Sequence, residues 1–181
     1  MLRIGEVEDK ILSEIKNDVE EAFKGIVTIK LSDTFLSIPE ESWNKSRRQY
    51  KSDIILEKID KMGRNMGLIL VGITPEDLYV SGLNFVFGQA KIHGNACIVS
   101  LHRLRPEFYG SIVSGEVLKK RLKKEIIHEL GHVLGLTHCF DKSCVMSFSN
   151  SIKDVDYKRE ELCHNCWRKL NEDKIHVPFR L

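Results

Sequence analysis

No stretch of this sequence is apolar enough to cross a membrane, and neither sign of charge dominates it. The longest strongly apolar segments, such as 68–73, are far shorter than the roughly 20 residues that a membrane-spanning helix needs. Lys and Arg number 28 and Asp and Glu 26, so the net charge of +2 offers no strong general attraction to nucleic acid or acidic membranes. With 42% hydrophobic and 30% charged residues, the 181-residue chain is predicted to form one compact domain.

The sequence also lacks the marks of a secreted, disulfide-bonded protein. Its first ten residues are acidic where a signal peptide is basic and then apolar, so we expect a cytoplasmic protein. The five cysteines, at positions 97, 139, 144, 163 and 166, are an odd number and cannot all pair within the chain. Four of them lie in the last quarter of the sequence in two close pairs, a grouping that indicates metal ligation.

What the sequence does contain is a regular succession of helix and strand patterns. The elements predicted for the first half are a helix over 7–23, a strand over 26–31, a loop over 32–48, a helix over 50–62 ended by Gly63 or Gly67, a strand over 68–73 and a short helical turn after Thr74-Pro75. Segments 84–90 and 96–101 predict a hairpin, with 96–101 as an edge strand. This order favours an α/β (α+β) fold in which helices pack on a mixed twisted sheet.

The longest helical pattern runs from Ser114 to Leu134. Leucine or isoleucine recurs every four residues from Leu118 and forms the predicted buried face. Five basic residues crowd positions 119–124 and form either a nucleic-acid patch or a solvated helix face. The run contains no aromatic side chain for stacking on bases, which favours the solvated face.

This helix ends in a histidine motif whose members are His128, Glu129, His132, Gly135 and His138. At 100° per residue, His128 and His132 lie one turn apart on one helix face, with Glu129 on the same side, so both imidazoles can bind one zinc ion. Gly135 suits a helix-ending residue with positive φ, and the turn can bring His138 to the same ion. Three histidines leave the fourth position of zinc open for water, which is the catalytic arrangement.

The clustered cysteines form a second metal-binding pattern. Two residue pairs, Cys139-x4-Cys144 and Cys163-x2-Cys166, are separated by eighteen residues. Four thiolates fill every position of a tetrahedral zinc ion and leave none for water, so this site is predicted to be structural. The alternative is four unligated, buried cysteines. Cys97 falls in a predicted strand, where a small apolar core residue is expected.

The histidine motif matches H-E-x-x-H-x-x-G-x-x-H and resembles that of the metzincin clan of zinc metallopeptidases, more narrowly the archaemetzincins. In that family a cysteine follows the third histidine, here Cys139, and four cysteines bind a second zinc ion. The resemblance covers residues 83–166 and implies a metzincin-like fold, two zinc ions per chain and a Met-turn at Met146 beneath the histidines. It also implies that the edge strand holds an extended substrate antiparallel to itself.

We therefore expect a zinc metallopeptidase with Glu129 as general base and a peptide or protein as substrate. No tyrosine follows Met146 closely to stabilise an oxyanion, so we expect slow or narrow activity. The alternatives are a two-zinc binding or regulatory protein that cleaves nothing, and a zinc-dependent RNA hydrolase suggested by the basic run. We expect a monomer without nucleic-acid or membrane partners. Its predicted parts are a subdomain over 1–138 with the sheet and the active-site helix, and a zinc-anchored subdomain over 139–181.

Overall fold

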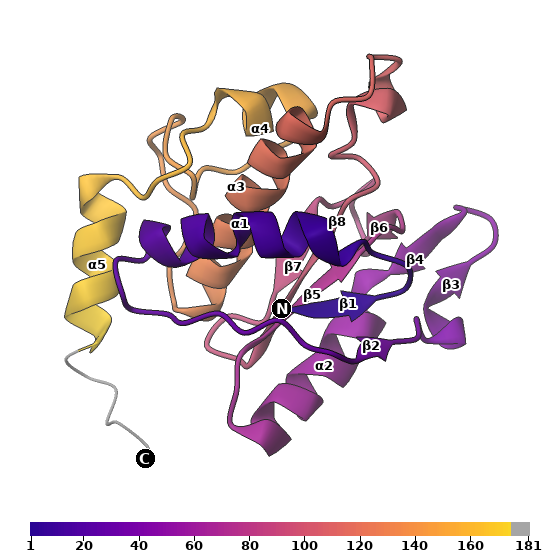
Figure 1. Ribbon diagram of the computed structural model, residues 1–181, viewed down its shortest axis with the longest axis horizontal. Helices are drawn as coiled ribbons and strands as arrows, with labels where there is room; N and C mark the ends of the chain where they lie inside the picture. The colour runs from indigo at the N-terminus through magenta and orange to yellow at the C-terminus, as the bar shows by residue number, and fades with distance from the viewer. Residues whose placement is uncertain (175–181) are drawn as a thin grey trace.

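A mixed five-stranded sheet forms the centre of the molecule in the computed structural model, which describes residues 1–174 (Figure 1). Its strands are, in spatial order, β2 (Phe35–Leu36), β1 (Leu2–Ile4), β5 (Leu70–Thr74), β8 (Ala96–Ser100) and β7 (Gly88–Ala90). Neighbouring strands are parallel except β7, which runs antiparallel to β8 at the edge. A smaller sheet consists of β3 (Trp43–Asn44), β4 (Gln49–Lys51) and β6 (Leu78–Tyr79).

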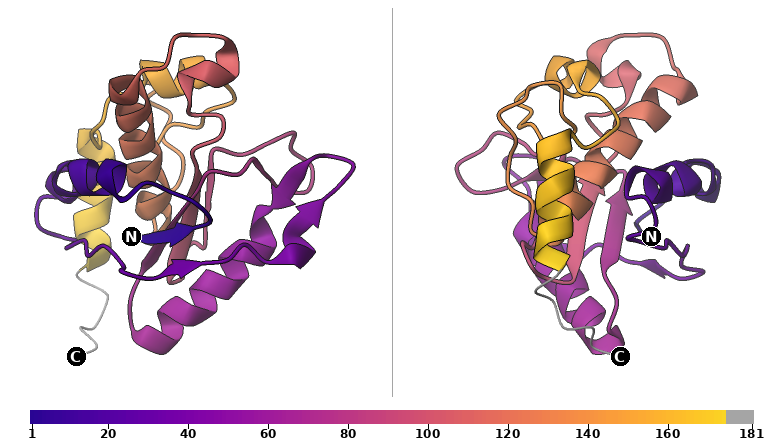
Figure 2. Two further views of the ribbon diagram at one scale, coloured as in Figure 1. Left: turned by 45° about the vertical axis from the view of Figure 1, so that its right-hand side comes forward. Right: turned by 90° about the vertical axis from the view of Figure 1, so that its left-hand side faces the viewer.

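Three long helices cover the two faces of the main sheet. Helices α1 (Asp9–Ala22) and α3 (Gly115–Val133) pack on one face, and α2 (Ser52–Met66) packs on the other (Figure 2). Side chains alternate along β8, so Cys97 and Val99 face α1 and α3 while Ala96 and Ile98 face α2. Because both faces are covered, all of β8 is buried, and Cys97 is the core residue that the sequence predicted.

The chain after α3 passes through α4 (Ile152–Tyr157) to α5 (His164–Lys174) and packs on the α3 side of the sheet. Two 3-10 turns, Glu40–Ser42 and Pro106–Tyr109, complete the described elements. Leu170 of α5 belongs to the same buried core as α1 and α3. The last part of the predicted C-terminal subdomain, 175–181, lies outside the described residues, and the division after residue 138 stays a prediction.

The predicted α/β class, the three helices, the strand over 68–73 and the hairpin are present. The Ser114 hydroxyl caps α3 by accepting a hydrogen bond from the Val117 N–H, and Gly67 ends α2 in the left-handed conformation. The helix over 50–62 begins two residues later than predicted, because Tyr50 pairs with Leu78 between β4 and β6. Within the described residues, no helix has the length and apolarity needed to cross a membrane.

Three local predictions for the first half of the chain are wrong. Residues 26–31 form no strand, because the Ile29 N–H donates to the Glu20 carboxylate rather than to a neighbouring strand. The predicted loop over 32–48 contains β2 and β3, which are too short to show an apolar pattern. The predicted helical turn after Thr74-Pro75 is absent: residues 75–76 form a bend, and β6 begins at Leu78 and pairs with β4.

Two predictions that concern the site are also wrong. Segment 96–101 is not an edge strand, because β8 lies between β5 and β7, and β7 is the edge. The basic run is not a solvated face, because Arg121 makes two hydrogen bonds of 2.7 Å to Asp156 and Lys124 donates to the carbonyl groups of Val155 and Asp156. Lys123 pairs with Asp18 of α1 and with Glu160. The basic run thus ties α3 to its neighbours.

Candidate active site and metal centres

Three histidine side chains meet near the C-terminal end of α3. One ring nitrogen from each of His128, His132 and His138 lies within 4.8 Å of the other two. The Nε2 atoms of His128 and His132 are 3.1 Å apart. Two ligands bound tetrahedrally to zinc at about 2.0–2.1 Å lie roughly 3.3 Å apart, so this pair of nitrogens fits a single ion.

Backbone carbonyl groups orient the two helical histidines. The Nδ1 atom of His128 lies 2.8 Å from the Val145 carbonyl oxygen, and that of His132 lies 2.7 Å from the Leu136 carbonyl oxygen. Since a carbonyl oxygen only accepts, each Nδ1 carries the proton and each Nε2 keeps its lone pair for a metal ion. Burial lowers the pKa of both rings, which favours the neutral form that a metal ion requires.

The turn at Gly135 brings in the third histidine. Gly135 has φ +96°, the left-handed conformation that the sequence predicted for the residue ending the helix. A Cβ atom added there would lie 2.6 Å from the His93 ring, so the turn also packs tightly against the hairpin loop. His138 is more exposed than the other two histidines, and its ring centroid lies 5.0 Å from that of Phe148.

Glu129 lies between α3 and the edge strand β7. A Cβ atom added to Gly88 of β7 would lie 2.7 Å from the Glu129 Oε1 atom, so the strand backbone and the carboxyl group are in close contact. Burial raises the pKa of Glu129 well above its usual value; the neighbouring Glu125 adds to the rise and Lys158 opposes it. Glu129 and the three histidines line one cavity of about 410 Å³, together with residues 83–90 and 148–150.

Met146 packs under the active-site helix. Its side chain is fully buried, and a Cβ atom added to Gly131 would lie 2.5 Å from the Met146 Sδ atom. The Met146 carbonyl group accepts a hydrogen bond of 2.9 Å from the Cys139 N–H, next to His138. In the same turn, the Val145 carbonyl group binds the His128 ring. The turn at residues 145–146 therefore supports His128 on the helix and His138 beyond it.

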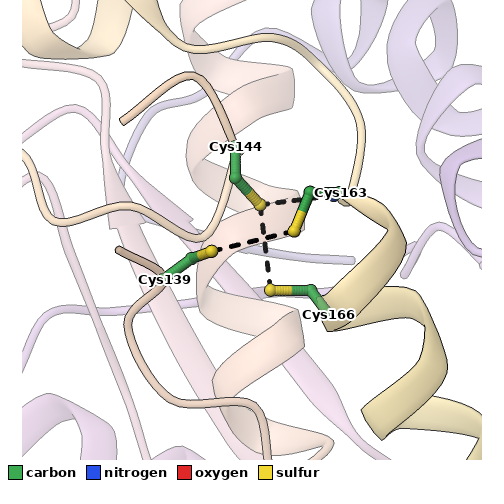
Figure 3. A group of neighbouring side chains, drawn as sticks. All are labelled: Cys139, Cys144, Cys163 and Cys166. Carbon is green, nitrogen blue, oxygen red and sulfur yellow. Dashed lines mark hydrogen bonds between the residues drawn. The ribbon is translucent and has the colours of Figure 1, made fainter. Parts of the chain in front are cut away.

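Four thiol groups converge at the start of α5 (Figure 3). Cys139 and Cys144 come from the loop after His138, whereas Cys163 and Cys166 come from α5 and the residue before it. The Sγ atoms of Cys139 and Cys163 are 3.7 Å apart and those of Cys144 and Cys166 are 3.8 Å apart. Tetrahedral zinc with Zn–S bonds of about 2.3 Å requires a separation of roughly 3.8 Å.

The four thiols do not share one tendency to ionise: hydrogen bonds from neighbouring groups outweigh burial at Cys163 and lower its pKa. Burial raises the pKa of Cys144 to about 11 and also raises that of Cys166, so neither thiol ionises readily without a compensating positive charge. A bound metal ion would supply that charge and deprotonate its thiol ligands. None of the five cysteines forms a disulfide, and Cys97 lies apart from the cluster in the sheet.

Several groups that form the site have no recognisable signal in the sequence. The carbonyl groups of Val145 and Leu136 have no side-chain signature, so no sequence pattern could have identified them. Ser149 lines the cavity, and its buried hydroxyl group has no hydrogen-bond partner among the residues that the structure describes. A serine three residues beyond Met146 is too common to attract attention on its own.

Comparison with known proteins identifies the family. The model of Peptidase family M54 matches residues 5–172. The chain belongs to peptidase family M54, the archaemetzincins. An archaemetzincin of Methanocaldococcus jannaschii is 45% identical to this M54 peptidase over 97% of this chain and 94% of the relative. One of Thermococcus kodakarensis is 42% identical, over 92% of this chain and 91% of the relative.

Solved structures agree with this assignment. A zinc-dependent peptidase of Methanocorpusculum labreanum superposes with a TM-score of 0.85 at 27% identity, over 94% of this chain and all of that one. The archaemetzincin of Archaeoglobus fulgidus, solved in complex with malonate, gives a TM-score of 0.77 at 33% identity, over 93% and 97% of the two chains. The predicted family, the predicted fold class and the prediction of a zinc-dependent metallopeptidase are thereby confirmed.

Proposed function

We propose that this M54 peptidase cleaves peptide bonds at the three-histidine cavity, with His128, His132 and His138 as ligands of the catalytic zinc ion and Glu129 as general base. The observation that carries the proposal is their common cavity. Three imidazole nitrogens cluster on one side of it, and a buried carboxyl group lies next to them against the edge strand. Zinc in this setting lowers the pKa of a water molecule toward 7 and polarises a carbonyl group.

Glu129 handles the proton in this reaction. Its carboxylate accepts a proton from the attacking water and later delivers that proton to the departing amine. Burial, which raises the pKa of Glu129, makes the carboxylate a better base than an exposed glutamate. Glu129 is one residue from the first histidine and faces β7, which places it beside the ligands rather than among them.

The edge strand β7 provides a backbone for substrate binding. On its inner side it pairs with β8, and β7 residues Gly88 and Ala90 line the cavity. An extended peptide can add to the outer side of such a strand through main-chain hydrogen bonds. Phe85 and Phe148 offer apolar surface to the side chains of the peptide, and the Ser149 hydroxyl offers one further hydrogen bond.

We further propose that Cys139, Cys144, Cys163 and Cys166 hold a second, structural zinc ion. Their mutual distances match four thiolate ligands, which fill all four positions of a tetrahedral ion and leave none for water. An RNA hydrolase is not favoured, because Arg121 and Lys124 of the basic run bind other groups of the same chain.

A peptide library incubated with wild type and with Glu129→Gln tests the catalytic proposal. Zinc-loaded wild type should cleave a subset of peptides, identified by mass spectrometry, and the variant should leave those peptides intact while it keeps its zinc. Equal cleavage by both proteins would exclude Glu129 as the base. An absence of cleavage by wild type would favour the two-zinc binding protein instead.

A further inference from the structure

A lysine and a glutamate form a buried ion pair next to the cavity. The Lys158 side chain is 0% exposed and that of Glu125 is 3% exposed. The Lys158 Nζ donates a hydrogen bond of 2.9 Å to Glu125 Oε1 and one of 3.4 Å to the Ser147 carbonyl group. The free energy needed to remove two charges from water often exceeds the attraction between them. A contribution to stability therefore does not explain why this ion pair is buried.

The ion pair connects the active-site helix to the segment that follows the methionine turn. Glu125 lies on α3 one turn before Glu129 and lines the cavity. Ser147 directly follows Met146 and precedes residues 148–150, which line the cavity. We call residues 147–150 the wall. Lys158, at the end of α4, therefore holds the start of this wall at a fixed distance from α3.

The other end of the wall is fixed independently. The N–H groups of Asn150 and Ser151 donate hydrogen bonds of 3.0 and 2.9 Å to the Asp154 carboxylate, in a capping box at the start of α4. Phe148 and Ser149 lie between the two fixed points. Phe148 packs against His138, and the Ser149 hydroxyl has no partner among the described residues.

We propose that Lys158 and Glu125 are positioning residues, whose ion pair holds the wall 147–150 at the place where it receives a peptide beside His138 and Glu129. The inference rests on the proposed peptide hydrolysis. Lys158 does not line the cavity, so it acts through Ser147 and Glu125 rather than on the substrate. The chemical class that the wall receives is an extended peptide, bound between residues 148–150 and β7.

The chain supplies a matched control. Arg121 and Asp156 also join α3 to α4, one helical turn before Glu125, through two hydrogen bonds of 2.7 Å. Neither residue lines the cavity or contacts residues 147–150 through its side chain. Breaking this pair should loosen the same two helices without moving the wall.

The test compares wild type, Lys158→Met/Glu125→Gln and Arg121→Met/Asp156→Asn, all loaded with zinc. The double substitutions leave no uncompensated buried charge, which guards against simple unfolding. Hydrogen exchange at the Ser147 amide reports on the end of the wall that Lys158 holds, and exchange at the Asn150 amide reports on the end that Asp154 holds. Values of kcat and KM are measured with one peptide that wild type cleaves. Metal content and melting temperature are recorded for each protein.

We expect the Lys158/Glu125 variant to keep both zinc ions, to exchange the Ser147 amide at least 10-fold faster and to lose about 10- to 100-fold in kcat/KM, mainly through KM. The Arg121/Asp156 variant should stay within twofold of wild type in exchange at these amides and in kcat/KM. If the Lys158/Glu125 variant matches wild type in either measurement, or if the control variant shows the same losses, the proposal is overturned. Should wild type cleave no peptide, the exchange measurement alone decides it, separately from the proposed function.

Discussion

The three-histidine site and the four-cysteine site differ in what surrounds their ligand atoms. The histidines line a cavity of about 410 Å³, with the Glu129 carboxyl group next to them. The cysteines line no part of that cavity, and their sulfur atoms face one another (Figure 3). The histidine site leaves room for water and substrate, whereas the cysteine site leaves none. Zinc would therefore serve catalysis at the histidines and folding at the cysteines.

The two sites are nevertheless joined by a very short piece of chain. His138 and Cys139 are adjacent, and the Cys139 N–H donates a hydrogen bond to the Met146 carbonyl group. The carbonyl group of the preceding residue, Val145, orients the His128 ring. Any metal ion held by the cysteines therefore restrains the backbone that carries the third histidine. The closed site can stabilise the geometry of the open site.

Removal of one thiol should produce the largest change in stability. In Cys163→Ala we expect the melting temperature to fall by about 10 °C or more, because several kcal/mol of structural zinc binding are lost. The matched variant is Cys97→Ala, in which a buried cysteine outside the cluster is truncated and the expected loss is only about 2–4 °C. Thermal unfolding of both proteins checks this, and equal melting temperatures would mean that the cluster does not anchor the fold.

Removal of the general base should leave stability intact and abolish most activity. Glu129→Gln is expected to keep both zinc ions and to lose about 10²–10⁴-fold in kcat. Glu116→Gln, at the exposed start of the same helix, should cleave like wild type. The rates of the three proteins on one peptide decide the matter, and a Glu129→Gln rate close to wild type would contradict the assignment.

The pH dependence should reflect the buried position of Glu129. The base acts only when it is deprotonated, and burial raises its pKa above the ordinary value of 4.5. Activity should therefore be complete above the raised pKa and fall about 10-fold per pH unit below it, beginning above pH 4.5. This acid limb belongs to the carboxylate and the attacking water as a coupled system. The positive charge of the zinc ion opposes this rise in pKa, so the observed limb reports the balance of burial and charge. A kcat/KM with no acid limb at all would contradict a carboxylate base.

A small effect is expected from the cavity wall itself. Ser149→Ala removes a hydroxyl group of the cavity that has no partner within residues 1–174. One hydrogen bond from it to a peptide would contribute about 0.5–1.5 kcal/mol, so KM should rise roughly 2- to 10-fold. Ser13→Ala, far away on α1, serves as the control. An unchanged KM for Ser149→Ala would remove this side chain from substrate binding.

The sequence predicted those parts of the molecule that depend on short-range spacing. Residues one helical turn apart share a face in any α-helix, so the spacing of His128 and His132 was informative without a structure. Gly135 was identified for a similar reason, since only a residue tolerant of positive φ ends a helix in that way.

Long-range pairing could not be predicted in the same way. The choice of β7 as the edge depends on which strand pairs with β5, and no local pattern records it. Strands as short as β1 and β6 gain their stability from neighbours rather than from their own composition. Lys158 and Glu125 are 33 positions apart, and each is an ordinary surface residue type until the fold buries them together.

Stepwise removal of zinc tests the difference between the open and closed sites most directly. Zinc per chain is measured before and after mild chelation, together with peptide cleavage and the melting temperature. We predict a fall from two equivalents to one, complete loss of cleavage and little change in the melting temperature, because the open site releases its ion first. Loss of both ions together, or a single remaining ion with cleavage intact, would contradict the assignment of one open catalytic site and one closed structural site.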